Sequence, residues 1–292
     1  MLPNFFIVGT AKAGTTSLYH YLEDHPEVYM CPIKEPNFFS YEEICRQSLY
    51  YKERGVGDRL EYENLFTGAR NKKAIGEASV SYLFYPATAT KIRKTCPKAK
   101  IIILVRDPID RAFFHYLMDT RLGYIDLSFE DIVFKKGSHH LLELYWQQYI
   151  GLSFYYDQVK RYLDIFGEEQ VKVLLNEDLR ENAFRVVLSV YEFLGINNSI
   201  LPDSERQHNV YQKPRNVLVR QLYSVNPLRT LAKAIIPARL VESVKDTLLV
   251  REEKPELSEN TRKYLASLFA DDTLKLQKLI NRDLSTWYKM DG

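Results

Sequence analysis

Residues 5–22, FFIVGTAKAGTTSLYHYL, place a glycine-bounded loop between an apolar run and a helical pattern. A buried strand, such a loop and a helix are the parts of a phosphate-binding loop with the signature G-x-x-x-x-G-K-[ST]. Here Thr15 stands at the lysine position and Lys12 lies inside the loop. Because helix N-termini attract anions, we expect an anion to face the amides of residues 14–17. The displaced lysine argues against ordinary kinase or ATPase chemistry. A glycine turn that binds nothing is the alternative.

Short apolar runs alternate with helical patterns over most of the chain. Runs typical of buried strands cover residues 5–9, 74–77, 101–106 and 171–175. Helical spacing of apolar residues covers 15–23, 86–94, 108–122, 149–166 and 183–194. This order predicts an α/β fold with a P-loop-like, three-layer αβα architecture around a central, mostly parallel sheet.

Two further helices are predicted from their caps. Ser128, three residues before Asp131, has the form of a capping box, and Ser258 precedes a long amphipathic pattern that ends near residue 283. We expect one domain over residues 1–292, with a C-terminal helical part of about residues 216–292 packed on it.

Charge and cysteine content exclude several classes of function. Forty basic and 38 acidic residues leave a net charge of only +2, so no general attraction to nucleic acid or membrane surfaces is expected. Nowhere do about 18 apolar residues run together, so no membrane span is predicted. The three cysteines lack metal-ligand spacing, which predicts reduced thiols, a cytoplasmic location and no metal site.

The loop resembles the 5′-phosphosulfate loop of sulfotransferases that use 3′-phosphoadenosine 5′-phosphosulfate (PAPS), and the resemblance extends over most of the chain. Heparan-sulfate-type and bacterial members are the most similar. The resemblance implies that PAPS is the sulfate donor, that 3′,5′-diphosphoadenosine (PAP) is the product and that no metal takes part. It implies that the 5′ side of the donor is bound by Lys12, Ala13, Gly14, Thr15, Thr16 and Ser17. An ammonium beside the leaving phosphate oxygen stabilises the transition state, and Lys12 is the candidate.

A carboxylate follows the loop in the segment IKEPNFF, residues 33–39. This segment resembles the K-E-x-x-F-F segment of heparan-type enzymes, which implies that Glu35 is the base that deprotonates the acceptor hydroxyl. Such a base accelerates transfer by about 10²–10⁴-fold. Lys34 is expected to pair with Glu35 or to help hold the sulfate. A solvated Lys–Glu pair is the alternative.

The segment from Ile101 to Tyr116 reads as a strand that enters a helix at Pro108. Arg106 then lies at the carboxyl end of a parallel strand, where α/β sheets bind ligands. It resembles the arginine that binds the 3′-phosphate in the family pattern R-x-P-x-x-R-x-x-S-x-Y. Phe114 stands where that pattern has serine, so the remaining 3′-phosphate contacts stay open, with His115 as one candidate.

Two further basic residues belong to a polar, proline-bearing segment. The run HNVYQKPRN, residues 208–216, resembles a bacterial loop whose basic side chains close over the 3′-phosphate. The resemblance implies that Lys213 and Arg215 bind the donor. A solvated loop is the alternative.

The acceptor side is the least defined part of the site. Residues 76–82, GEASVSY, follow a predicted strand and resemble a segment that lines the acceptor in relatives. Candidate acceptor contacts are therefore Lys34, Glu77, Ser81 and Tyr82, with helix capping and strand-end packing as the alternative for the last three. The acceptor is expected to carry a hydroxyl, on a sugar, a carrier-bound polyketide-type chain or another alcohol.

Together these features predict in-line transfer of a sulfuryl group from PAPS to a hydroxyl. Two rival functions remain open. One is a P-loop nucleotide kinase or hydrolase with an unusual loop, and the other is a nucleotide-binding module without catalytic activity.

Overall fold

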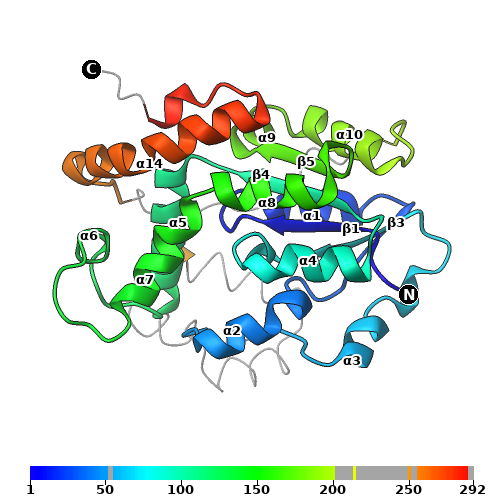
Figure 1. The fold of residues 1–292 in the computed structure, drawn as a ribbon, viewed down its shortest axis with the longest axis horizontal. Helices are drawn as coiled ribbons and strands as arrows, with labels where there is room; N and C mark the ends of the chain where they lie inside the picture. The colour runs from blue at the N-terminus through cyan, green and yellow to red at the C-terminus, as the bar shows by residue number, and fades with distance from the viewer. Residues whose placement is uncertain (52–54, 201–212, 215–248, 251–254, 289–292) are drawn as a thin grey trace.

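A five-stranded, wholly parallel sheet runs through the centre of the protein (Figure 1). The computed structural model describes residues 1–51, 55–200, 213–214, 249–250 and 255–288. The strands follow the spatial order β2-β3-β1-β4-β5. Their bounds are β1 Phe5–Gly9, β2 Val28–Met30, β3 Ala74–Ala78, β4 Lys100–Val105 and β5 Val171–Leu175. The predicted α/β class is confirmed.

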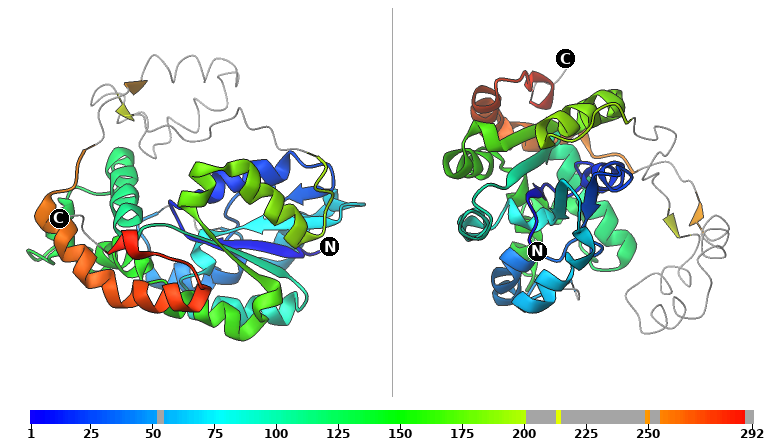
Figure 2. Two further views of the ribbon diagram at one scale, coloured as in Figure 1. Left: turned by 90° about the horizontal axis from the view of Figure 1, so that it is seen from above. Right: turned by 90° about the vertical axis from the view of Figure 1, so that its right-hand side faces the viewer.

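Helices cover both faces of the sheet, and Figure 2 shows these layers from two further directions. On one face lie α4 (Pro86–Thr95) and α8 (Tyr156–Phe166), and on the other lie α1 (Thr15–Glu23), α9 (Asn176–Glu181) and α10 (Ala183–Leu194). Side chains of a strand point alternately to its two faces. In β1, Phe6 and Val8 therefore pack toward α4 and α8, whereas Phe5 and Ile7 pack toward α1. Parallel sheets buried on both faces need such continuous apolar strands.

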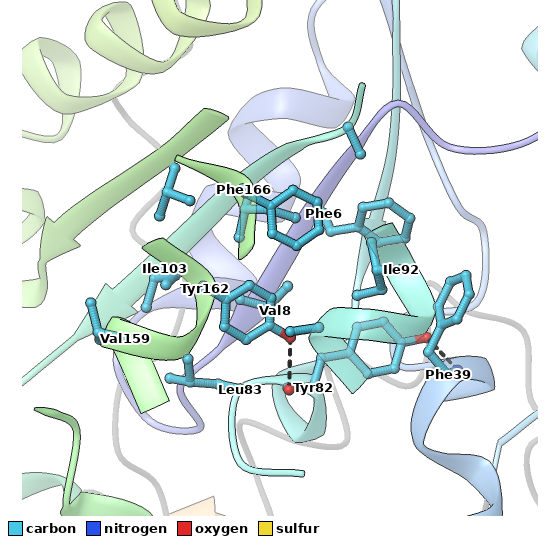
Figure 3. Packing of buried hydrophobic residues seen from close by; sticks show 14 of the residues in the cluster. Phe6, Val8, Phe39, Tyr82, Leu83, Ile92, Ile103, Val159, Tyr162 and Phe166 are labelled. Carbon is cyan, nitrogen blue, oxygen red and sulfur yellow. Dashed lines mark hydrogen bonds between the residues drawn. The ribbon is translucent and has the colours of Figure 1, made fainter. Parts of the chain in front are cut away.

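The apolar core between the sheet and the helices α4 and α8 contains aromatic rings as well as aliphatic side chains (Figure 3). Phe6 and Phe39 meet edge to face at 5.8 Å between ring centroids. The Tyr162 hydroxyl of α8 donates to the Tyr82 carbonyl at 2.8 Å, and the Tyr82 hydroxyl accepts from the Phe39 amide at 3.2 Å. These bonds satisfy the polar ends of fully buried tyrosines, so the loop after β3 is fixed to the core.

A separate group of helices lies beyond the carboxyl ends of the strands, at the left of Figure 1. It contains α5 (Pro108–Leu122), α6 (Phe129–Val133) and α7 (Leu142–Tyr149), which share a third apolar core with α14 (Glu259–Ile280). Two short helices, α2 (Tyr41–Gln47) and α3 (Arg59–Asn64), connect β2 to β3. The sheet edge where ligands bind in this fold class therefore faces α5.

The predicted helix at residues 149–166 starts too early, because only residues 156–166 of that range form α8. α7 ends at Tyr149, a single 3₁₀ turn spans Gly151–Ser153, and α8 begins at Tyr156. The Arg111 guanidinium accounts for the break, since it donates to the carbonyls of Gln148, at 3.0 Å, and of Tyr149. These carbonyls are thereby bound to a side chain where α7 ends. Asp272 of α14 then caps the new helix by accepting from the amides of residues 155 and 156.

Both helix caps predicted from serines are present. Ser128 accepts from the Asp131 amide at 3.1 Å, and Ser258 accepts from the Thr261 amide at 3.4 Å. α14 ends at Ile280, three residues before the expected end, and packs on α5 and α8. The single domain over residues 1–292 stays a prediction, and residues 215–248 lie outside the described part. Among the described residues, no helix is long and apolar enough to cross a bilayer.

Candidate active site

The loop between β1 and α1 is held tightly against the sheet. The Thr10 amide donates to the Leu104 carbonyl of β4 at 2.6 Å, and the Ala13 amide returns to the Thr10 carbonyl at 3.3 Å. Gly14 closes the loop with φ at +97°, a conformation that suits glycine. A Cβ atom there would lie 2.9 Å from Leu179 Cδ2 and 3.0 Å from Asn176 Nδ2. Glycine is therefore required at position 14 both by backbone conformation and by space.

α1 begins without a side-chain cap and without an acidic residue in its first turn. The first amides of a helix have no carbonyl of a preceding turn to bind, and they carry the positive end of the helix dipole. Thr15 and Ala13 are buried, whereas Thr16 and Ser17 are partly exposed. The predicted donor loop, residues 12–17, thus forms a turn with the geometry of an anion site.

The Lys12 side chain extends toward α5. Its Nζ lies 3.2 Å from Met118 Sδ, and its backbone has φ at +69°. Burial lowers the pKa of Lys12 to about 8, the positive charge of Arg121 acts in the same direction, and Asp119 opposes them. Lys12 therefore loses its proton as the pH rises through about 8, far below the pH at which an exposed lysine does so.

Arg106 lies directly after β4 and contacts the loop. Its Nη1 donates to the Lys12 carbonyl at 3.3 Å, and its Nη2 donates to Asp110 Oδ2 at 3.0 Å. The guanidinium carbon also lies 4.1 Å from the ring centroid of Phe114. The structure therefore brings together two of the predicted donor-binding residues, Lys12 and Arg106.

The loop that carries Glu35 is attached to the end of the neighbouring strand. The Glu35 amide donates to the Ala78 carbonyl, the last residue of β3, at 3.1 Å. Asn37 fixes the loop further, since its side chain donates to the Glu35 carbonyl at 3.0 Å and its amide donates to Ser79 Oγ at 3.0 Å. Lys34 Nζ pairs with Glu35 Oε1 at 3.1 Å, and the Glu35 side chain is 35% exposed. The carboxylate is held in place and is reachable from solvent.

Lys12, Glu35 and Arg106 thus lie at the ends of three adjacent strands. Lys12 follows β1, the Glu35 loop is bound to β3, and Arg106 follows β4, in a sheet ordered β3-β1-β4 at this place. Parallel strands end at one edge, so the cation, the carboxylate and the guanidinium share that edge. This is the place where α/β sheets bind ligands.

Two of the predicted acceptor contacts are placed inside the protein. Glu77 is fully buried and accepts from Tyr62 at 2.5 Å and from Ser79 at 2.7 Å. Burial raises the pKa of Glu77 to about 7. Tyr82 is also fully buried, with its hydroxyl bound to the Phe39 amide. An acceptor would have to displace core packing to touch either side chain, so their placement gives them a supporting role behind the Glu35 loop.

Ser81 lies between Glu77 and Tyr82 in the sequence and forms hydrogen bonds near the Glu35 loop. Its hydroxyl donates to Asn37 Oδ1 at 2.6 Å and contacts Ser40 Oγ at 2.8 Å. Because Asn37 holds the Glu35 carbonyl, Ser81 belongs to the network that supports the candidate base. Lys34 and Ser81 remain predictions as acceptor contacts.

Of the two basic residues predicted to close over the 3′-phosphate, Lys213 and Arg215, the structure describes only one. Lys213 lies in the two-residue strand β6 (Lys213–Pro214), which pairs antiparallel with β7 (Leu249–Val250) apart from the main sheet. Arg215 lies outside the described residues. Donor binding by both residues stays a prediction.

His115 does not fill the place of the missing serine. It is 5% exposed, its Nδ1 contacts Arg111 Nη1 at 3.3 Å, and its Nε2 contacts the Tyr51 hydroxyl at 3.0 Å. Burial and the neighbouring Arg111 lower the pKa of His115 well below its usual value, so it is neutral. Arg111 itself is fully buried, which indicates a structural role.

Sequence reasoning missed a buried cluster around Asp119. The hydroxyls of Tyr50, Tyr51 and Tyr149 donate to Asp119 Oδ2 at 3.0, 2.5 and 2.8 Å. Asp119 Oδ1 is buried without a hydrogen-bond partner among the described residues. The sequence signal is weak, because the tyrosines come from distant segments and only the four-residue spacing from His115 places Asp119 on the buried face of α5.

Asn176 is the second residue that sequence reasoning missed. It is the first residue of α9, directly after β5, and its Nδ2 donates to the Ala13 carbonyl at 2.9 Å. This bond ties the donor loop to the far side of β4. An asparagine after a strand carries no signal for such a distant partner.

Among the described residues, no group of three or more His, Cys, Asp or Glu side chains is arranged to hold a metal ion. The three cysteines are free thiols.

Comparisons with known proteins agree with this arrangement. The chain is 27% identical to carbohydrate sulfotransferase 15 of Rattus norvegicus over 270 residues, 73% of this chain and 46% of the relative. It is 23% identical to bifunctional heparan sulfate N-deacetylase/N-sulfotransferase 1 of Mus musculus over 296 residues, 99% of this chain and 31% of the relative. The chain therefore spans less than half the length of these curated relatives.

A solved sulfotransferase from Alicyclobacillus acidocaldarius matches over nearly the full length of both chains. The TM-score is 0.73 and the identity 33%, with 99% of this chain and 100% of the other covered. The family model named Sulfotransferase domain matches residues 2–233, which include β1 to β5 and the whole described sheet edge. The chain belongs to the sulfotransferase domain family, whose members are transferases of sulfur-containing groups that use PAPS.

Proposed function

We propose that this sulfotransferase moves a sulfuryl group from PAPS to a hydroxyl of its acceptor by in-line transfer, with Glu35 as base. The observation that carries the proposal is the shared strand edge, where Lys12, Glu35 and Arg106 follow or adjoin β1, β3 and β4. Two cations that follow neighbouring strands, Lys12 after β1 and Arg106 after β4, suit a donor with two anionic ends. A carboxylate on the adjacent strand suits a nucleophile that must lose a proton.

The donor-binding roles follow from the contacts of the loop. The amides at the start of α1 bind the 5′-phosphosulfate, since that helix has no side-chain cap and no acidic first turn. Arg106 binds the 3′-phosphate through its planar guanidinium, which pairs well with phosphate oxygens. Lys213 and Arg215 close over the same phosphate from the segment between β5 and α14.

The transfer step uses the two remaining charges. The acceptor oxygen attacks sulfur while Glu35 takes its proton, and the bond from sulfur to the bridging phosphate oxygen breaks. Negative charge then grows on that oxygen, where the Lys12 ammonium stabilises it. Lys34 keeps the Glu35 carboxylate in place through the 3.1 Å pair before the acceptor arrives.

A carbohydrate is the first acceptor class to test. The names of two relatives specify carbohydrate and heparan sulfate sulfotransferases, and both matches span most of this chain. A carrier-bound β-hydroxyl chain and other alcohols would meet the same base, so they belong in the same screen. We further propose a reducing compartment such as the cytoplasm, which the three free thiols support. Recovery of the native protein with disulfides would contradict that location.

The test is an acceptor screen with radiolabelled PAPS, followed by two variants on the best acceptor. Glu35→Gln should lower kcat by about 10²–10⁴-fold because the base is lost. Lys12→Ala should lower kcat by about 10²–10³-fold because the leaving oxygen loses its counter-charge. Glu42→Gln is the matched control, since Glu42 pairs with Lys91 at the surface and is 73% exposed.

Each rival function has its own outcome. Normal transfer by both Glu35→Gln and Lys12→Ala would refute the assigned roles. Label that stays on the donor with every acceptor, while PAP still binds, would indicate a binding module. A larger rise in melting temperature with ATP and magnesium than with PAP alone would indicate a kinase or hydrolase.

A further inference from the structure

Phe114 occupies the position where the family pattern has a serine that contacts the 3′-phosphate. In the structure it lies on α5, one residue before His115, and is partly buried. The Arg106 guanidinium carbon lies over the Phe114 ring, 4.1 Å from the ring centroid. A phenylalanine cannot donate to a phosphate, so its contribution must pass through the residue that it touches.

Arg106 is held on its edges as well as on its face. Nη1 donates to the Lys12 carbonyl at 3.3 Å and Nη2 donates to Asp110 Oδ2 at 3.0 Å. The side chain is only 14% exposed. The plane of the guanidinium is therefore defined by three contacts that come from the donor loop and from two turns of α5.

We propose that Phe114 is a positioning residue that fixes Arg106 in the orientation required for the 3′-phosphate, in place of a direct hydrogen bond from serine. This inference rests on the proposed function, because it assumes that Arg106 meets that phosphate. Phe114 touches neither donor nor acceptor in this account. It acts by limiting the rotamers of the residue that does.

The chemistry of a guanidinium favours this arrangement. Arginine carries five N–H donors in one plane, and the two bonds to described residues use two of them. An aromatic ring on the face occupies none of the donors, so the edges stay available for bidentate binding of phosphate oxygens. A serine would add one donor but would leave the long side chain without support. Preorganisation reduces the entropy lost on binding, which compensates for the lost contact.

Asp110 competes with a 3′-phosphate for Arg106, which is a second reason to fix the guanidinium. It pairs with Arg106 at 3.0 Å and lies 3.7 Å from Arg262 of α14. A 3′-phosphate would have to compete with this carboxylate for the same guanidinium. The guanidinium carbon of Arg106 lies over the Phe114 ring, so in our proposal the ring keeps the side chain in place while its partner changes from carboxylate to phosphate.

The experiment compares two nucleotides that differ only at the 3′ position. PAP and adenosine 5′-monophosphate are titrated calorimetrically into the full chain and into Phe114→Leu, which keeps an apolar side chain but loses the π face. We expect PAP affinity to fall about three- to thirtyfold, as a partly desolvated cation–π contact implies, and the affinity for the monophosphate to stay within about twofold. Phe114→Ser, which restores the hydroxyl, should recover part of the PAP affinity.

A double-mutant cycle separates positioning from general stability. In an Arg106→Lys background, Phe114→Leu should weaken PAP no further, because lysine offers no planar group to stack. Phe113→Leu is the matched control, since Phe113 packs on Phe129 in the third core and should change PAP affinity by less than about twofold. With PAPS as substrate, Phe114→Leu should raise KM and leave kcat nearly unchanged.

The outcomes distinguish this inference from the proposed function. If the unmodified chain binds no PAP, the proposed function is wrong and this inference falls with it. If the chain binds PAP but Phe114→Leu weakens both nucleotides equally, or the cycle is additive, the positioning role alone is overturned. Circular dichroism and melting temperatures of every variant verify that each one is folded before its affinity is compared.

Discussion

The N-termini of α1 and α5 begin in the same setting and are completed in opposite ways. Each helix follows a central strand of the sheet, α1 after β1 and α5 after β4. α5 is capped by Asp107, which accepts from the amides of Ile109 at 2.8 Å and of Asp110 at 3.2 Å. α1 has Gly14 at the capping position, no side-chain cap and no acidic residue in its first turn. One helix end is capped by a side chain, whereas the other has no side-chain cap and is the donor site that we propose.

This difference shows how one fold assigns separate tasks to equivalent positions. Carboxylates at the start of α5 neutralise the positive end of its dipole, so an anion gains little there from the helix itself. The positive charge near the start of α5 is that of Arg106, which directly precedes the capping residue Asp107. At α1 the proposed hydrogen-bond donors are backbone amides, and the proposed positive charge is that of Lys12. A phosphosulfate therefore suits the first site, and a phosphate that pairs with a guanidinium suits the second.

Among changes at the two helix ends, the largest effect should come from Gly14→Ala. Alanine at φ +97° with a Cβ atom 2.9 Å from Leu179 should cost about 1–3 kcal/mol of unfolding free energy and distort the loop. We expect PAP affinity to fall by at least about tenfold. Calorimetric titration and urea denaturation measure the two effects.

Gly195→Ala is the control for backbone strain alone. Gly195 has φ at +75°, and nothing lies within 4 Å of its added Cβ atom. It should lose about 1–2 kcal/mol of stability at unchanged PAP affinity. Equal affinity losses in the two variants would mean that the α1 end is not the donor site.

The geometry of α1 could be predicted from sequence because its cause is local. The strand, the loop and the helix lie within residues 5–23, and the predicted bounds of β1 and α1 match the observed ones. The strand at 171–175 and the helices at 108–122 and 183–194 were predicted equally well, since each is a continuous apolar or helical pattern. The break after Tyr149 could not be predicted, because its cause is the distant Arg111 side chain.

A smaller effect is expected from Asn176→Ala, which removes the bond from Asn176 Nδ2 to the Ala13 carbonyl. A buried hydrogen bond contributes about 1 kcal/mol, so stability should fall by that amount and PAP affinity by about three- to tenfold as the loop loosens. Asn182→Ala is the control, because Asn182 caps α10 and its loss should cost similar stability without changing PAP affinity. Unchanged affinity in Asn176→Ala would show that the loop is rigid without this bond.

The parts of the site that sequence did not reveal share one property: they depend on contacts between distant segments. Asn176 reaches a loop 163 positions away, and Tyr50 reaches Asp119 over 69 positions. Glu77 and Tyr82 show the converse case. A resemblance in a short segment suggested acceptor contacts, whereas the fold buries both side chains completely. Motif spacing identifies chemistry at a strand end, but it does not say which side chains point outward.

Asp107→Ala tests the capped helix of the pair. Loss of an N-cap carboxylate should lower the unfolding free energy by about 0.5–2 kcal/mol, and Asp107→Asn should retain most of the stability because it keeps a capping oxygen. We expect PAP affinity to change less than in Gly14→Ala. If Asp107→Ala loses as much PAP affinity as Gly14→Ala at unchanged stability, the anion binds at the N-terminus of α5 and not at that of α1.

The smallest effect concerns the charge of Lys12. Its pKa is lowered to about 8 by burial and by Arg121, while Asp119 opposes them, and Arg106 and Arg111 add to the lowering. The protonated form is the active one, so kcat/KM for PAPS should be level below pH 8 and should fall as pH rises through it. In Lys12→Arg the cation persists at higher pH, so the alkaline limb should disappear even if the rate is lower. Asp119→Asn removes a negative charge that raises the pKa of Lys12, so the alkaline fall in kcat/KM should move below pH 8. If the alkaline fall is unchanged in Lys12→Arg, another group is responsible for it.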